Sequence, residues 1–233
     1  MLGGLLKGAT GVGAPFLAVP IMAILVDVPF AVAVFLIPNI LSNAWQTWRF
    51  RSEFSDHRFS LTWALAGMVG AGIGTVALAR FSSAVLTTSV ALVVLAYVVF
   101  RLANPGWSLA RETAKRLAGP VGGIGGFFQG AIGLSGPVSV TFMNAAGLPR
   151  PQFIYIMSLY FLAMTLIQLP VQLVFGVMTP DRMTYGLLAL APLIIGMLIG
   201  DYLGKRISKT TFDKVIFVIL TLLALRLLAE NFF

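Results

Sequence analysis

The chain has 233 residues, of which 58% are apolar and only 10% are charged. Because a soluble domain usually carries about 25% charged residues, this composition excludes an ordinary soluble protein and indicates an integral membrane protein. The chain has no cysteine, which excludes disulfides, thiolate nucleophiles and iron–sulfur ligands. Its net charge of +8 comes from basic residues in short loops between apolar runs. The positive-inside bias of membrane proteins explains this charge without a nucleic-acid partner.

The first element in chain order is an apolar segment, residues 3–26, interrupted by the run KGATGVGAPFLAVP from Lys7 to Pro20. Glycine tolerates a backbone with positive φ, and proline suits the first turn of a helix, where its missing N–H is not needed. We therefore expect a helix that stops at the glycines and restarts at Pro15. In a membrane such a break survives only where it is buried in protein or lines a cavity, so it is a candidate functional site.

Three apolar runs follow, at residues 30–49, 59–79 and 84–103. Each has about 20 residues, which as a helix rising 1.5 Å per residue crosses about 30 Å of hydrocarbon. The polar and basic stretch that comes next, residues 104–118, is predicted to be a linker between two halves.

The second half repeats this plan, with a broken segment at residues 119–147 that contains QGAIGLSGPVSVTF. Equivalent residues of the two broken segments lie 122 positions apart: Gly8 and Gly130, Gly11 and Gly133, and Pro15 and Pro137. An internal repeat of this size in a membrane protein is typical of transporters and channels. Three more apolar runs follow, at residues 152–177, 183–203 and 210–230, so the chain divides into a first repeat (1–103), the linker (104–118) and a second repeat (119–233).

The positions of lysine and arginine favour one topology. If all eight segments cross the membrane, these residues split nine against six, whereas re-entrant hairpins give twelve against three, with Lys7 outside both counts. The positive-inside rule favours the second split. The predicted fold is therefore an all-α integral membrane protein with two inverted repeats, each a re-entrant broken-helix hairpin plus three transmembrane helices; eight full spans are the alternative. We expect both termini outside and the following basic loops in the cytosol: 49–58, 101–118 and 205–214.

The two helix starts form the first candidate site. The first N–H groups of a helix have no intrahelical partner and carry the positive end of the helix dipole, so they bind anions. Two such starts, entering from opposite leaflets, would hold one small anion near the midplane. Close helix packing is the better explanation for upstream glycines such as Gly4 and Gly8. The candidate residues at the breaks are Thr10, Gly11, Gly13, Gly133, Ser135 and Gly136.

Amide and hydroxyl side chains form a stripe on the second segment of each half. Uncharged amides in hydrocarbon need partners and face the bundle interior or a wet cavity. They are candidates for substrate binding, with the Tyr160 hydroxyl as a further donor, while hydrogen bonding between helices is an equal alternative. At spacings that put each set on one helical face, the stripes are Asn39, Ser42, Asn43 and Gln46, and Ser158, Thr165, Gln168 and Gln172.

Lys7 precedes the first break, and its counterpart before the second break is Gln129. A lysine there could balance the charge of an anionic substrate, or could extend to the membrane surface. The chain has one histidine and no HExxH motif. We therefore expect no metal site, no cofactor and no catalytic site, and the protein is predicted not to be an enzyme.

The segments GVGAPFLAVP and GLSGPVSVTF, with DVPFAVAV and GLPRPQFI downstream of them, resemble the TauE/SafE sulfite exporter family, also called TSUP or DUF81. The resemblance covers nearly the whole chain. Two departures are Thr141-Phe142, where the family usually has Val-Pro, and GVGAP, where three consecutive glycines are common. The resemblance implies a bacterial or archaeal cytoplasmic-membrane permease for sulfite, an organosulfonate or another sulfur-containing or carboxylate anion.

The predicted function is secondary transport of a small anion by alternating access around a midplane site. A channel for small solutes, built on opposed half-helices, is the alternative, and a membrane scaffold without substrate is a third hypothesis. The expected partners are the anion and the lipid bilayer, and a coupling proton or other ion and a second copy of the chain stay open. We also expect valine at Gly133 or Gly136 to abolish anion binding while the protein stays folded.

Overall fold

The computed structural model describes residues 1–54, 56–204, 206 and 209–232, and these residues form helices and connecting loops without a β-strand. The first half contains α1 (Leu2–Thr10), α2 (Ala14–Leu25), α3 (Val28–Arg49), the 3-10 turn η1 (Arg51–Glu53), α4 (His57–Arg80) and α5 (Ser83–Ala103). The second half contains α6 (Arg111–Ile132), α7 (Gly136–Ala145), α8 (Arg150–Val174), α9 (Pro180–Leu188), α10 (Leu190–Gly204) and α11 (Lys209–Phe232).

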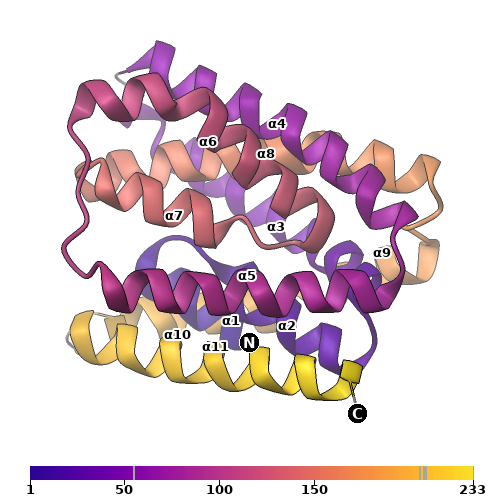
Figure 1. Cartoon of the computed structure of the whole chain (residues 1–233). Coiled ribbons are helices and arrows are strands. Elements are labelled where there is room, and N and C mark those ends of the chain that lie inside the picture. Colours follow the sequence, from indigo (N-terminus) through magenta and orange to yellow (C-terminus); the bar gives the residue numbers. More distant parts are fainter. Residues whose placement is uncertain (55, 205, 207–208, 233) are drawn as a thin grey trace.

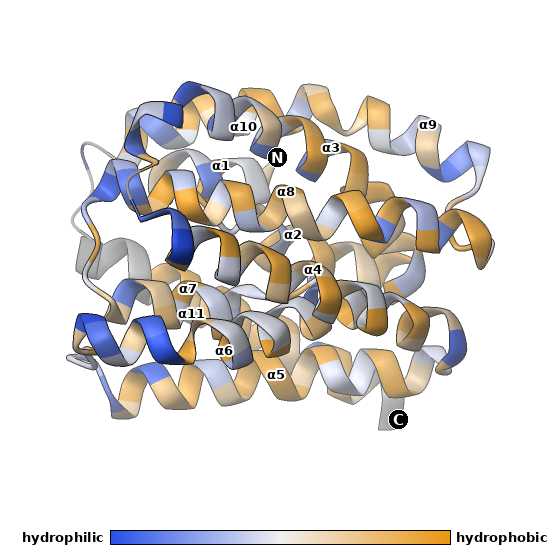
Figure 2. Cartoon of the chain, turned by 90° about the horizontal axis from the view of Figure 1, so that it is seen from above, coloured by the Kyte–Doolittle hydropathy of each residue, from blue (hydrophilic) through white to orange (hydrophobic). Residues whose placement is uncertain are grey.

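Five helical stretches in the described part of the chain are long and apolar enough to cross a membrane. They are α3, α4, α5, α8 and the α9–α10 pair, and α11 adds a shorter apolar stretch at Val215–Ala229. The long helices run roughly along one direction (Figure 1), with hydrophilic residues gathered at both ends of the bundle and apolar residues between them (Figure 2). The prediction of an all-α, multi-pass membrane protein is confirmed.

Both predicted breaks are present. The first helix stops at Gly11, whose φ is 86°, and Gly13 has the same φ before α2 begins. In the second half, α6 stops at Gly133 with a φ of 72°, and α7 begins at Gly136. These positive φ values are the conformation that glycine adopts at low cost, which explains why glycine stands at each stop.

Two element boundaries differ from the sequence prediction. The second broken segment begins at Arg111 rather than near Gly119, because the charged residues expected in the linker form the first turns of α6. The expected single span at residues 183–203 is two helices, α9 and α10, that meet at Ala189. Pro192 accounts for the division, since a proline cannot donate a backbone hydrogen bond to the carbonyl four residues earlier.

The loops identify two ends of the bundle. The linker end holds the loop between α5 and α6, where the Leu109 amide donates to the Ala145 carbonyl, 2.8 Å away. The far end holds the loops after α4 and α8, where Arg80 lies 5.5 Å from the centre of the Phe175 ring.

The two broken segments run in opposite directions. Close contacts pair Gly4 with Gly196 and Ala9 with Gly204, so α1 runs parallel to α10 and ends near the linker end. Contacts from α4 to α6 also advance together along both helices, so α6 starts at the linker end and runs away from it. Figure 1 shows α7 turning back beside α6.

Glycines let these helices pack backbone to backbone. A Cβ on Gly126 would collide with the Gly67 carbonyl of α4, and one on Gly8 would collide with the Met197 carbonyl of α10. The packing role predicted for the upstream glycines is confirmed. Because α1 ends at the first break and α6 at the second, this packing positions the candidate site.

Candidate functional site

The first break is held by side chains from α3 and α8. Gln46 donates from Nε2 to the Gly11 carbonyl at 3.0 Å, and Ser158 donates to Gln46 Oε1 at 3.3 Å. The Thr10 hydroxyl accepts from the Val12 amide at 3.3 Å and lies 2.7 Å from the Val12 carbonyl. The stripe residue Gln46 therefore fixes the left-handed turn at which α1 ends.

Lys7 is buried, with 2% of its surface exposed. Its ammonium donates to Asn43 Oδ1 at 2.7 Å and to Ser42 Oγ at 2.9 Å, and Asn43 in turn donates to Asn39 Oδ1 at 2.6 Å. No carboxylate of the described chain lies within ion-pair distance of it. The lysine thus points into the protein beside α3 and carries no counter-charge of its own.

The second break has a corresponding arrangement without a charge. Gln168 donates from Nε2 to the Gln129 carbonyl at 3.3 Å, and Gln129 Oε1 accepts from the Ser135 amide at 3.3 Å. The Ser135 and Ser139 hydroxyls lie 3.1 Å apart. The Gln168 Oε1 atom and both polar atoms of the Gln172 amide are buried without a hydrogen-bond partner in the described structure.

Each short helix starts with backbone donors that no described protein group accepts. At the first break these are the amides of Gly13 and Ala14, and at the second break it is the amide of Gly136. Proline follows at Pro15 and at Pro137, so the next position of each helix has no N–H. The donors that remain free are those expected at a helix N-terminus that binds an anion.

Phe16 of α2 packs against the start of α7. Its buried side chain belongs to the first turn of α2, and a Cβ added at Gly136 would collide with its ring. Valine at Gly136 would therefore displace the packing of Phe16. At Gly133, valine would be strained by the φ of 72° and by Val32 and Val19, 3.0 and 3.1 Å from its Cβ. The expectation that these variants leave the fold intact does not agree with this packing.

Two predicted residues direct their polar groups away from the two helix stops. The Tyr160 hydroxyl donates to the Gly122 carbonyl at 2.8 Å, and its ring stacks on Trp63 with centroids 4.6 Å apart. The Thr165 hydroxyl donates to the Leu162 carbonyl of its own helix at 2.9 Å. Neither has a hydrogen bond to a residue of either break, unlike Gln46 and Gln168.

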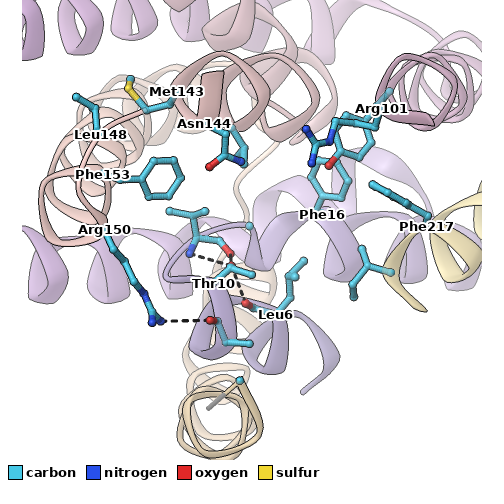
Figure 3. Close-up of a pocket in the computed structure, with 17 residues that line it drawn as sticks. Leu6, Thr10, Phe16, Arg101, Met143, Asn144, Leu148, Arg150, Phe153 and Phe217 are labelled. Carbon is cyan, nitrogen blue, oxygen red and sulfur yellow. Dashed lines mark hydrogen bonds between the residues drawn. The ribbon is translucent and has the colours of Figure 1, made fainter. Parts of the chain in front are cut away.

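A cavity of about 420 Å³ opens beside the first break, and most of its polar lining lies outside the predicted site. Thr10 and Gly13 are the only candidate residues that line it, whereas Arg101, Asn144 and Arg150 were not candidates (Figure 3). The one sequence signal near them is Arg150 within the GLPRPQFI segment. These residues come from α5, α7 and α8, so their proximity depends on the tertiary fold.

Comparison with known proteins agrees with this architecture. The family model described as Sulfite exporter TauE/SafE matches residues 1–227, which is nearly the whole chain. No curated protein and no solved structure matches the chain. A match of this extent, to an all-helical chain with five membrane-spanning stretches in its described part, confirms the resemblance in the sequence. The chain belongs to the TauE/SafE sulfite exporter family of membrane transport proteins.

Proposed function

We propose that the protein is a secondary transporter that moves a small anion, such as sulfite, an organosulfonate or a related carboxylate, across a bacterial or archaeal cytoplasmic membrane. The anion binds between the starts of α2 and α7. Free amides at Gly13, Ala14 and Gly136 contact it from the two sides. Alternating access rocks one half of the protein against the other around this site.

The opposite directions of α1 and α6 support this arrangement. In the proposed topology the α1–α2 and α6–α7 pairs are re-entrant hairpins that enter from opposite membrane faces. The loops at the linker end carry most of the arginines and lysines and lie in the cytosol. Lys205 and the side chains of Lys209 and Lys214, which belong to the predicted cytosolic loop 205–214, lie outside the described part of the structure.

The observation that carries the proposal is the environment of Lys7. A buried ammonium with only neutral partners is costly, because desolvation is not offset by an opposite charge. Its partners Asn43 and Ser42 supply oxygen atoms but no negative charge. An anion bound at the adjacent helix start supplies that charge, which gives the lysine a role that packing alone does not.

The test is flux into proteoliposomes that contain the purified protein. Uptake of labelled sulfite or an organosulfonate should saturate with concentration and should depend on an imposed ion gradient or on counter-anion inside. Rapid, non-saturating flux would instead indicate a channel. The absence of anion flux from correctly inserted protein, across a panel of sulfur-containing and carboxylate anions, would contradict the proposal.

A further inference from the structure

The cavity beside the first break is lined mostly by residues that do not belong to the candidate anion site. Its walls come from α1 and α2, the C-terminal end of α5, the C-terminal half of α7, the start of α8 and α11. Lys7, Gln129 and the amide stripes do not line it. The cavity therefore lies at the linker end, and it reaches the start of α2 through Thr10, Gly13 and Phe16 without including the Lys7 network.

Two polar side chains face this cavity without a partner. Arg101 is half-buried, and its guanidinium has no hydrogen bond or ion pair within the described chain. The Asn144 side-chain amide likewise has none, and Figure 3 shows both groups directed into the cavity. Arg150 lies at the rim, where it donates from Nη2 to the Ala9 carbonyl at 3.3 Å. Among the described residues that line the cavity there is no aspartate and no glutamate.

The remaining lining is largely apolar and aromatic. Phe16, Phe153 and Phe217 contribute rings, and aliphatic side chains such as Leu6 and Leu148 complete the wall. A volume of about 420 Å³ falls within the range of about 300–1,000 Å³ that is typical of sites for small organic ligands. An inorganic oxyanion would fill little of this space and would leave the rings without contacts.

We propose that this cavity is a second binding site, which takes an organic anion with an aromatic or hydrocarbon body. The anionic group lies against Arg101 and Asn144, where a guanidinium and an amide offer several N–H donors to sulfonate or carboxylate oxygens. The hydrocarbon body lies against the phenylalanine rings. Arg150 adds positive charge at the entrance and attracts the anion to it.

One part of this proposal rests on the proposed transport function. It is that the anion bound in the cavity is the transported substrate, on its way to the helix starts, or a competitor of that substrate. Binding in the cavity does not depend on that role. A measurement of binding and a measurement of flux therefore test the two proposals separately.

The experiment uses calorimetric titration of the purified protein in phosphatidylcholine nanodiscs with three probes. Benzenesulfonate has both the charge and the ring, benzenesulfonamide has the ring without the charge, and sulfite has the charge without the ring. We expect benzenesulfonate to bind at least tenfold more tightly than either of the other two at this site. Equal binding of benzenesulfonamide would overturn the proposal without any variant.

The matched variants are Arg101→Gln and Arg80→Gln. Losing a charged hydrogen-bond donor should weaken benzenesulfonate binding about tenfold in Arg101→Gln. Arg80 lies at the far end, where its guanidinium packs on the Phe175 ring, so Arg80→Gln should bind as the unaltered protein does. Unchanged binding in Arg101→Gln would overturn the cavity site and leave the transport proposal untouched.

Two further outcomes separate the sources of the signal. Binding that depends on Arg101 in a protein that transports no anion would support the cavity site and contradict the transport proposal. An anionic lipid headgroup with its acyl chains shares the chemistry of the probe. Loss of benzenesulfonate binding when phosphatidylglycerol is added would assign the cavity to lipid and overturn the proposal of a soluble ligand.

Discussion

The two breaks share a backbone plan but differ in how their polar atoms are used. At the first break, Lys7 and Gln46 both reach acceptors on neighbouring elements, and the buried lysine supplies a positive charge. At the second break the equivalent position is Gln129, which is neutral, and Gln168 keeps one buried oxygen without a partner in the described structure. The repeat therefore preserves geometry while its two copies carry different chemistry.

This difference suggests a division of roles at the proposed anion site. In that proposal the first break would balance the negative charge through Lys7, and the second break would offer uncharged polar atoms that adapt to the rest of the ligand. A symmetric pair of charges would bind an anion more tightly but would release it less readily. Variants that exchange or remove features of one break can test this division.

The largest effect is expected for Lys7→Gln, which makes the first break resemble the second. Glutamine can still donate to Asn43, so the protein should fold, but the counter-charge for the anion is lost. Because a hydrogen bond between charged groups contributes about 1.5–3 kcal/mol, anion flux into proteoliposomes should fall by about 10- to 100-fold.

Two companion variants act as controls for Lys7→Gln. Lys7→Arg keeps the positive charge and should retain more flux than Lys7→Gln. Gln129→Lys adds a second buried charge, which should lower stability because no described carboxylate lies near it. Full flux in Lys7→Gln would show that the lysine is structural and would remove the main support for the transport site.

The next effect comes from a matched pair, Gln46→Leu and Gln168→Leu. Leucine at position 46 leaves the Gly11 carbonyl without its donor, so we expect a loss of about 1–3 kcal/mol in the free energy of unfolding. Leucine at position 168 removes an oxygen that has no described partner, and the Gln129 carbonyl keeps its bond from the Gly133 amide, 2.9 Å away. That change should stay within about 1 kcal/mol.

Unfolding by a denaturing detergent, followed by circular dichroism, measures both free energies. Flux assays should show a loss that the unfolding measurement does not: Gln168→Leu should transport less anion than the unaltered protein while keeping its stability. Equal destabilisation by the two substitutions would mean that the second break is as tightly built as the first. The charge of Lys7 would then be the difference that remains between the two breaks.

The breaks themselves were predictable because their cause is local. Glycine at the stop and proline at the restart leave the chain few other conformations, and Gly11, Gly13, Gly133 and Gly136 stand where the sequence predicts. For the polar stripes, the sequence predicts that each amide needs a hydrogen-bond partner inside the protein, but it does not predict which residue that partner is. That Gln46 binds the Gly11 carbonyl, and that Tyr160 turns to Gly122, depends on how α3, α8 and α6 pack.

The features that escaped prediction have causes outside the local sequence. The start of α6 at Arg111 lacks a side-chain cap that would have marked it. The cavity combines Arg101 from the end of α5 with Asn144 from the end of α7. Residues so far apart meet only when the bundle forms, and in the sequence Arg101 is indistinguishable from any loop arginine that satisfies the positive-inside rule.

A smaller effect is expected for alanine at Gly11 and at Gly133, with Gly147→Ala as their control. All three glycines have positive φ, but a Cβ on Gly147 meets nothing within 4 Å. Gly147→Ala should therefore cost only the conformational strain, about 1–2 kcal/mol. A Cβ on Gly11 would lie 2.7 Å from Ile154 Cγ1, and one on Gly133 would lie 3.0 Å from Val32 Cγ2.

Crowding should add about 1–3 kcal/mol at each break, as read from the midpoint of thermal unfolding. If Gly11→Ala and Gly133→Ala lose no more stability than Gly147→Ala, the breaks tolerate side chains that this packing excludes. The relative loss also ranks the two breaks, because isoleucine and valine are both β-branched and stiff at χ1, while the added Cβ lies closer to its neighbour at Gly11 than at Gly133. Gly11→Ala is therefore expected to be the more destabilising of the two.

The smallest effect concerns two helix caps that stand at equivalent places in the two halves. Asp56 caps α4 by accepting from the Phe59 amide at 3.3 Å, and Thr179 caps α9 by accepting from the Arg182 amide at 3.3 Å. Only Asp56 is also paired across the halves, with Lys115 at 3.3 Å and Arg111 at 3.5 Å. Replacing either cap with alanine should cost about 0.5–2 kcal/mol, but only one of them should respond to pH.

Burial raises the pKa of the Asp56 carboxyl, but the Phe59 amide, Lys115 and Arg111 outweigh burial and hold that pKa below its ordinary value of 3.8. Because the folded pKa is the lower one, the stability contributed by Asp56 is present above about pH 4 and is lost as the pH falls through the folded pKa. The Thr179 cap has no ionisable group and should contribute equally at every pH. Stability should therefore fall between pH 5 and pH 3 by more in the unaltered protein than in Asp56→Ser, whereas Thr179→Ala should follow the unaltered protein. Parallel curves for Asp56→Ser and the unaltered protein would mean that Asp56 acts as a neutral cap does, and that its pairing with α6 contributes little to holding the two halves together.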